Sequence, residues 1–480
     1  MILSMANYYI SYNFLIVFLS SLVFKALPLH GDERPNFVVI LCDDLGYGDI
    51  SCYGNKIIKT PNIDRLASQG IRFTDYYSPS PVCSPSRVGL LTGRTPNRAG
   101  IYDWIPSGTQ FHLEEKEFTI PKMLKRVGYA TCMSGKWHCN GKFNKKSQPQ
   151  PGDFGFDHWF ATQNNAAPSH RNPKNFVRNG EGVGELEGFS CRIVAEEANR
   201  WIENHVIENP DQPFFTFIAF HEPHEPISSP ESMISNYPNA QKKGEALYYA
   251  NVENMDFAVG MIMDCLNRNK VAENTLVIFT SDNGPETLNR YGGAWRSHGS
   301  PGDLRGMKLH THEAGIRVPG VMRWPLQIKA GQVSDEPVNS LDLMPTFANL
   351  AAGEIPIDIQ LDGTDIVNAF GKDEVIRKRP MFWCYYSALN KSKVALRDGN
   401  WKLLASLKSK NDKYLKIRSL NKSNYDLIKT ARLVDFELYN IGNDNDESLN
   451  LVDKNHDEFK RLSEAMRMMF DEVLKDSKIW

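Results

Sequence analysis

The sequence predicts an α/β protein with a large, mostly parallel central sheet flanked by helices, followed by a smaller C-terminal antiparallel sheet plus helix. Apolar, β-branched runs such as residues 36–44 (NFVVILCDD) are typical of parallel strands covered on both faces. They alternate with segments that carry helix signals, such as residues 60–70 (TPNIDRLASQG), where Pro61 begins a helix and Gly70 stops it. From about residue 375, strand-like runs follow one another without helices, which favours an antiparallel arrangement.

The remaining elements of the large sheet follow in chain order. Residues 119–128 (TIPKMLKRVG) repeat the helix pattern and stop at a glycine. Residues 213–221 (PFFTFIAFH) and 274–284 (NTLVIFTSDNG) predict two more buried strands, and a long helix over roughly 244–268 lies between them. We therefore expect one large domain over residues 34–370.

A separate subdomain is expected over residues 375–480. Its strands are predicted at 380–386, 393–406 and 435–441, with an Asp-Gly hairpin signal in the second run and a Lys-rich loop over 408–424. Residues 457–475 (DEFKRLSEAMRMMFDEVLK) form an amphipathic pattern that predicts a closing helix.

Composition excludes several classes of function. The 480 residues carry 55 basic and 57 acidic side chains, a net charge of −2, without a long run of one sign, so the chain lacks the footprint of a nucleic-acid-binding protein. The eight cysteines form no CxxC pair, which argues against a zinc ribbon or a thioredoxin motif. The sequence does not indicate which cysteines, if any, form disulfides.

The first 31 residues differ from the rest of the chain. Residues 14–24 (FLIVFLSSLVF) form an apolar run that is short for a bilayer span and resembles the core of a secretory signal. Residues 1–31 are therefore predicted to be a signal peptide or a retained N-terminal anchor, and the protein is expected to be exported to the periplasm or secreted.

Polar residues follow several of the predicted strands, in Asp43-Asp44, residues 134–138 (SGKWH), residues 221–226 (HEPHEP) and Asp282-Asn283. The carboxyl ends of strands in an α/β sheet line one edge, where ligands bind, so these clusters are expected to converge. Adjacent aspartates repel each other unless a cation lies beside them. Three carboxylates and an amide oxygen are hard ligands, which suit Ca²⁺ or Mg²⁺ rather than zinc. The alternative is that one aspartate caps a turn while the other is solvated.

Cationic side chains near such a metal site would need an anion between them. The candidates are Arg87, Lys136 and Lys308, with His138 and His224. A tetrahedral oxyanion such as sulfate or phosphate fits this set of charges. Each lysine could instead be a solvated surface charge, and spacing alone does not place Lys308.

Cys83 lies at the start of a predicted helix in residues 81–94 (PVCSPSRVGLLTGR). Pro85 is tolerated in a first helical turn, and a helix beginning near Ser84 places Cys83 at its positive end, with Arg87 one turn further on the same face. A buried structural thiol and a reactive thiolate are both consistent with this position. A thiolate beside an anionic ester and three aspartates would be electrostatically unfavourable.

Residues 83–87 (CSPSR), followed by 90–94 (LLTGR), resemble the signature of the formylglycine-dependent sulfatases. Residues 43–49 (DDLGYGD), 60–77 and 304–319, together with the GKWH, HEPHEP and TSDNG segments, resemble other blocks of that family in the same order. The resemblance extends over roughly residues 34–350. It implies an alkaline-phosphatase-like fold and a sulfatase catalytic domain over residues 34–370.

The resemblance also implies a role for each candidate residue. Cys83 would be oxidised to formylglycine by a formylglycine-generating or equivalent maturation enzyme, and its hydrate would attack sulfur. Arg87 would steady the hydrate, His138 would assist it and the later elimination, and His224 would protonate the leaving alcohol, with His221 as the alternative. Lys136 and Lys308 would bind sulfate oxygens, and the calcium ligands would be Asp43, Asp44, Cys83, Asp282 and Asn283.

The substrate is expected to be a sulfated glycan or a small sulfate ester, because the His-rich blocks are similar to those of sulfatases that act on polysaccharides. Candidate contacts are Asn164, Asn165, His170 and Arg171 in the polar loop 162–176, and His310. Trp104, Trp295 and Trp383 could stack on a sugar ring, although core packing is the more common role of a tryptophan.

Three other functions remain open from the sequence. A phosphonate or phosphodiester hydrolase of the same superfamily can share the motif around Cys83. A protein that binds sulfated glycans without maturing Cys83 would keep the thiol. A cysteine hydrolase would depend on a thiolate and would not need calcium.

Overall fold

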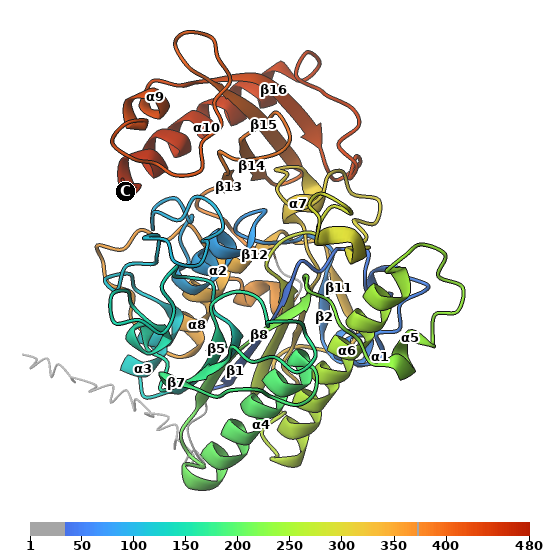
Figure 1. Ribbon diagram of the computed structural model, residues 1–480. Coiled ribbons are helices and arrows are strands. Elements are labelled where there is room, and N and C mark those ends of the chain that lie inside the picture. Colours follow the sequence, from blue (N-terminus) through green and yellow to red (C-terminus); the bar gives the residue numbers. More distant parts are fainter. Residues whose placement is uncertain (1–33, 372–373) are drawn as a thin grey trace, which may run out of the picture. The chain divides into compact units, whose positions relative to one another are not determined.

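The computed structural model describes residues 34–371 and 374–480, so the predicted signal or anchor at 1–31 lies outside the described residues. The central element is a ten-stranded sheet (Figure 1). From edge to edge its strands are β11 (Gln332–Ser334), β2 (Ile71–Phe73), β10 (Gly320–Arg323), β9 (Thr275–Ser281), β1 (Asn36–Asp43), β8 (Phe214–Pro223), β4 (Ala130–Lys136), β5 (His158–Thr162), β6 (Val177–Arg178) and β7 (Glu181–Gly182).

The middle of this sheet is parallel, as the sequence predicted. Strands β9, β1, β8, β4 and β5 pair in parallel, whereas β10 runs antiparallel to both β9 and β2, and β6 and β7 form an antiparallel edge. The edge strands are short and were not predicted, because two- to four-residue strands leave almost no periodic signal in the sequence.

Strand β1 is apolar throughout because both faces of the sheet are covered. Phe37, Val39 and Leu41 belong to a core shared with α2 (Cys83–Thr92), α3 (Ile120–Arg126) and α8 (Leu343–Leu350). Val38 and Ile40 point to the opposite core, shared with α1 (Pro61–Ser68), α4 (Ser190–Glu208) and α6 (Glu245–Arg268). Figure 1 shows α4 and α6 side by side on that second face. No described helix is both long and apolar enough to cross a membrane.

The C-terminal region forms the predicted small antiparallel sheet. Its strands are ordered β13 (Met381–Cys384), β14 (Val394–Asp398), β15 (Trp401–Lys408) and β16 (Arg432–Asn440), with α10 (His456–Asp476) packed on one face through Leu462, Met466 and Phe470. A short helix, α9 (Tyr425–Lys429), precedes β16. The β14–β15 hairpin turns at Gly399-Asn400 rather than at Asp-Gly, because Asp398 already pairs with Trp401 and Gly399 adopts the positive φ of 56°.

Buried ion pairs join the small sheet to the segment that follows Lys308. Lys402 on β15 lies 2.7 Å from Glu313, on α7 (Glu313–Ile316), and 2.9 Å from Glu447. Burial opposes ionisation of Glu313, yet Lys402 and Arg317 lower its pKa to about 2. The pKa of Glu447 is raised to about 7, because its burial and the charge of Glu313 outweigh the attraction of Lys402. Glu313 therefore provides the charge that neutralises Lys402.

We expect Glu313→Gln to lower the free energy of unfolding by roughly 3–5 kcal/mol, because it leaves a buried lysine without its main counterion. The matched control is Glu464→Gln on α10, an exposed position that should stay within about 0.5 kcal/mol of the wild type. Urea denaturation measures both variants, and equal stabilities would contradict this account of the interface.

Candidate active site

Two neighbouring parallel strands bring the predicted metal-binding residues together. In the register of β1 with β9, Cys42 is opposite Ser281, so Asp43 and Asp282 leave the sheet side by side. The Asp282 amide donates to the Cys42 carbonyl at 3.0 Å, and the Asp44 amide donates to Asp282 Oδ1 at 3.3 Å. The expected convergence of these carboxylates is confirmed.

Three buried cations surround the carboxylates, each held by a different element. Arg87 on α2 donates through Nε to Asp282 at 2.9 Å and through Nη1 to the Lys136 carbonyl at 2.8 Å. Lys136, the last residue of β4, lies 2.5 Å from Asp43. Lys308, in the loop before α7, lies 2.6 Å from Asp44, so the structure places it in the site where spacing alone could not.

The carboxyl groups respond to burial and to these cations in different ways. Burial opposes ionisation of Asp43, but Lys136, His224 and Arg87 bring its pKa well below the ordinary value. For Asp44 and Asp282, burial and neighbouring carboxylates outweigh the cations and raise each pKa to about 6. Three carboxylates thus face three cations, but burial makes full ionisation of Asp44 and Asp282 costly.

The donor set fits a divalent cation. Asp43 Oδ1 and Asn283 Oδ1 are buried without a hydrogen-bond partner, while Asn283 Nδ2 donates to Asp44 Oδ1 at 2.7 Å. Candidate ligand atoms of Asp43, Cys83 and Asp282 lie within 4.8 Å of one another. Unsatisfied buried oxygens are costly unless a hydrogen bond or an ion satisfies them.

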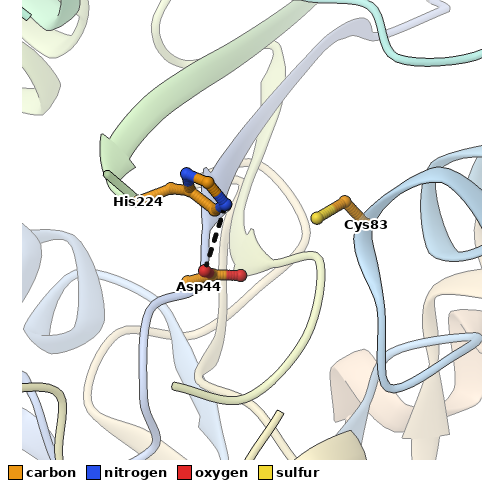
Figure 2. A group of neighbouring side chains, drawn as sticks. All are labelled: Asp44, Cys83 and His224. Carbon is orange, nitrogen blue, oxygen red and sulfur yellow. Dashed lines mark ion pairs between the residues drawn. The ribbon is translucent and has the colours of Figure 1, made fainter. Parts of the chain in front are cut away.

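Cys83 is the first residue of α2, and its side chain points into this cluster. Figure 2 shows its sulfur facing His224 and Asp44, and the candidate ligand atoms of these three residues also lie within 4.8 Å of one another. Burial raises the pKa of the Cys83 thiol to about 12 despite Lys136 and Lys308. The unmodified side chain is thus a neutral thiol at pH 7 and a poor nucleophile.

The three histidines take different positions. His224 lines the active-site pocket, with Nε2 3.6 Å from Asp44, and burial lowers its pKa to about 4. His138 also lines the pocket; its Nε2 is 3.1 Å from the Ile105 carbonyl, and its Nδ1 has no partner. His221 is buried beside Thr162, at 2.8 Å, and is not among the residues that line the pocket. Of the two histidines in HEPHEP, His224 is therefore the one in position to reach a substrate.

The pocket above Cys83 has a volume of about 560 Å³. Of the predicted substrate contacts, Asn164 and Asn165 line it, as does Trp104. The sequence did not point to the other residues that line it, which are Val82, Asp103, Arg290, Tyr291, Leu309, Tyr385, Ser387, Leu389, Lys416 and Arg418. Lys416 and Arg418 belong to the loop 408–424, whose basic composition was the available signal.

The other predicted substrate contacts lie elsewhere. His170 is fully buried, and its Nδ1 lies 3.2 Å from Asn251 Nδ2. The prediction that His170 contacts the substrate directly is therefore wrong. Arg171 is exposed outside the pocket lining. His310 stacks on His312, and its Nδ1 lies 3.0 Å from the Met307 carbonyl, also outside the lining.

Two of the tryptophans also take other roles. Trp383 is buried and donates to the Ser78 carbonyl, which makes it a core residue. Trp295 packs against Lys243 and Arg296 away from the pocket. All eight cysteines are free in the described structure.

Comparisons with known proteins identify the family of this chain. A family model described as "Sulfatase" matches residues 35–354, and one described as "N-sulphoglucosamine sulphohydrolase, C-terminal" matches residues 307–416. Arylsulfatase A of Homo sapiens is 35% identical over 407 residues, covering 80% of this chain and 77% of the relative. N-acetylgalactosamine-6-sulfatase of Rattus norvegicus is 34% identical, covering 73% and 68%.

A solved structure has a similar fold. The crystal structure of Ps i-CgsB in complex with k-i-k-neocarrahexaose superimposes with a TM-score of 0.76 and 28% identity, and the match covers 93% of this chain and 94% of that one. With the family model covering most of the described catalytic region, the chain belongs to the sulfatase family and is a sulfuric ester hydrolase.

Proposed function

We propose that this enzyme hydrolyses sulfate esters of a sulfated carbohydrate, with Cys83 matured to formylglycine and calcium bound at the strand ends. The observation that carries the proposal is the position of the Cys83 sulfur, which is grouped within 4.8 Å both with Asp43 and Asp282 and with Asp44 and His224. A group built from residue 83 would thus lie between the metal-binding oxygens and a proton-transferring imidazole.

The metal would be held by Asp43, Asp44, Asp282 and Asn283, with the matured side chain of Cys83 beside them. These donors are carboxylate and amide oxygens, which favour Ca²⁺, with Mg²⁺ as the less suitable ion. When bound, the cation supplies positive charge that polarises the sulfate ester.

Maturation of Cys83 explains why a neutral, buried thiol occupies the position of the nucleophile. As a hydrated aldehyde, the matured side chain would supply the oxygen that attacks sulfur. The thiol itself, with its pKa of about 12, does not suit a cysteine hydrolase. Arg87, fixed between Asp282 and the Lys136 carbonyl, would orient the attacking oxygen, and the free Nδ1 of His138 could hold its proton.

The lysines and His224 would act on the ester itself. Lys308 lines the pocket and Lys136 is buried against Asp43; both ammonium groups would bind sulfate oxygens as charge develops on them. His224 is neutral in the free site, and an anionic ester beside it would favour its protonated form, which can protonate the leaving oxygen.

A carbohydrate substrate is supported by the shape of the pocket and by the structural relative. The pocket is larger than a single sulfate requires, and Trp104, 43% exposed, offers an aromatic face at its rim. Ps i-CgsB, with a similar fold, was crystallised with a carrageenan-type oligosaccharide. Export to the periplasm or the exterior, where such glycans occur, remains our proposal for the location.

Cys83→Ala should reduce turnover of an aryl sulfate by roughly 10³-fold or more, because the nucleophile is removed. Cys52→Ala, at a half-buried cysteine outside the pocket, should stay close to the wild type. Mass spectrometry of the Cys83 peptide should show a loss of about 18 Da on maturation, as the thiol sulfur and two hydrogens are replaced by one oxygen. Full activity of Cys83→Ala, or turnover of aryl phosphate or phosphonate in place of sulfate, would refute the proposed chemistry.

Calcium should stabilise the wild type, by about 2.7 kcal/mol at a hundred times its Kd, and the effect should disappear in Asp282→Asn. The reason is that Asp282 contributes an oxygen to the proposed site. Thermal unfolding with and without calcium after chelation measures this without any assay of activity. Asp303→Asn, at an exposed position in the loop that carries Lys308, should keep the stabilisation by calcium. Loss of that stabilisation in Asp303→Asn, or its persistence in Asp282→Asn, would count against the assignment of Asp282 as a ligand.

His224→Ala should slow hydrolysis of a sugar sulfate by roughly 10²–10⁴-fold while slowing that of nitrophenyl sulfate much less, because a phenolate leaves without protonation. Kinetics of both esters on the same preparation give the comparison. His310→Ala, outside the pocket lining, serves as the control. An equal loss on the two esters would show that His224 does not act as the general acid.

A further inference from the structure

The pocket wall contributed by the C-terminal region carries two cations without counterions. Lys416 and Arg418 line the pocket, are exposed, and form no ion pair with any residue in the described ranges 34–371 and 374–480. The other cations of the lining are already paired: Lys308 lies 2.6 Å from Asp44, and Arg290 makes bonds of 2.6 and 2.7 Å to the two Glu286 oxygens. Lys416 and Arg418, called here the outer cations, are therefore available to an incoming anion.

The one acidic residue of the lining does not neutralise the outer cations. Asp103 is half-buried and accepts hydrogen bonds from the Tyr385 hydroxyl at 3.0 Å and from the Trp104 amide at 2.9 Å. Burial raises its pKa, whereas Arg418 lowers it, but Asp103 and Arg418 do not come within ion-pair distance. Lys416 also lies near Lys393, a second cation, which strengthens the positive potential of this wall.

The outer cations lie where the pocket continues. A smaller hollow of about 130 Å³ shares Asp103, Trp104 and Arg418 with the main pocket and extends along Ile101, Pro106 and Phe111. Trp104, exposed by 43%, lies at the junction of the two hollows. A substrate longer than one sugar ring can therefore occupy both, with a ring on Trp104 and substituents near Arg418.

We propose that Lys416 and Arg418 form a second oxyanion subsite, so that the preferred substrate carries an anionic group besides the sulfate that is cleaved. This inference rests on the proposed function and narrows it to glycans with at least two anionic groups, the second being a sulfate ester or a uronic carboxylate. Lysine and arginine are the side chains that bind such oxyanions, and a pair of them confers selectivity through charge. The cleaved sulfate still binds at Lys136 and Lys308, so the subsite acts on affinity and selection.

The test measures binding to the Cys83→Ala protein by calorimetry, so that no turnover intervenes. The probes are three galactose-based disaccharides: one with a single sulfate, one with two sulfates, and one with a sulfate and a uronic carboxylate. We expect the two-anion probes to bind roughly tenfold more tightly than the single-sulfate probe at low salt, and this ratio to fall as salt screens the exposed charges. The two doubly charged probes show whether sulfate or carboxylate is preferred.

Lys416→Gln and Arg418→Gln are then introduced together into the Cys83→Ala protein. The ratio of its affinity for a two-anion probe to its affinity for the single-sulfate probe should fall to about one. The matched control is Lys410→Gln/Lys422→Gln, which removes two exposed charges of the same loop region that do not line the pocket, and it should keep the ratio. Equal affinities for all three probes, no binding of any probe, or the same loss in the control would overturn the proposal. Failure of the proposed function would be recognised separately, because the matured wild type would then not hydrolyse sulfate esters at all.

Discussion

The structure depends on the repulsion between carboxylates that two adjacent parallel strands deliver to one point. Asp43 and Asp282 leave β1 and β9 in register, and Asp44 follows directly. In a buried site this charge has to be neutralised, and the fold supplies Arg87, Lys136 and Lys308 from three separate elements. Burial is nevertheless the largest influence on Asp44 and Asp282 and raises the pKa of each to about 6 despite these cations. Asp43 Oδ1 and Asn283 Oδ1 remain buried without a hydrogen-bond partner, and these are atoms that the proposed cation would satisfy.

The same electrostatic arrangement explains why Cys83 is placed at the start of a helix and beneath a pocket. The sheet fixes the carboxylates, α2 fixes Cys83 and Arg87 relative to each other, and the loop before α7 carries Lys308. Buried ion pairs of Glu313 with Lys402 then hold α7 against the small C-terminal sheet. The reactive centre is thereby built from a sheet, a helix and a loop that buried ion pairs hold together, as precise positioning of reacting groups requires.

Features that follow from local sequence patterns, such as buried strands and the residues at their ends, could be predicted. Features set by tertiary packing could not. Buried strands ending in polar residues predicted the meeting of Asp43 with Asp282, because parallel strand ends share an edge. The burial of His170 was missed, since a histidine in a polar loop gives no sign that Asn251 will cover it. The contribution of Lys416 and Arg418 was missed for a similar reason: they lie more than three hundred residues after Cys83 in the sequence and meet it only through the packing of the small sheet.

The division of the pocket between the two sheets has a consequence for how its selectivity can be altered. The groups that would carry out the chemistry come from residues 43–308, whereas much of the outer wall comes from residues 385–418. Substitutions in the later segment can therefore alter which sulfate ester is admitted while the balance of charges around the strand ends is preserved. A change of specificity and a loss of chemistry would thus be caused by substitutions in different stretches of the chain.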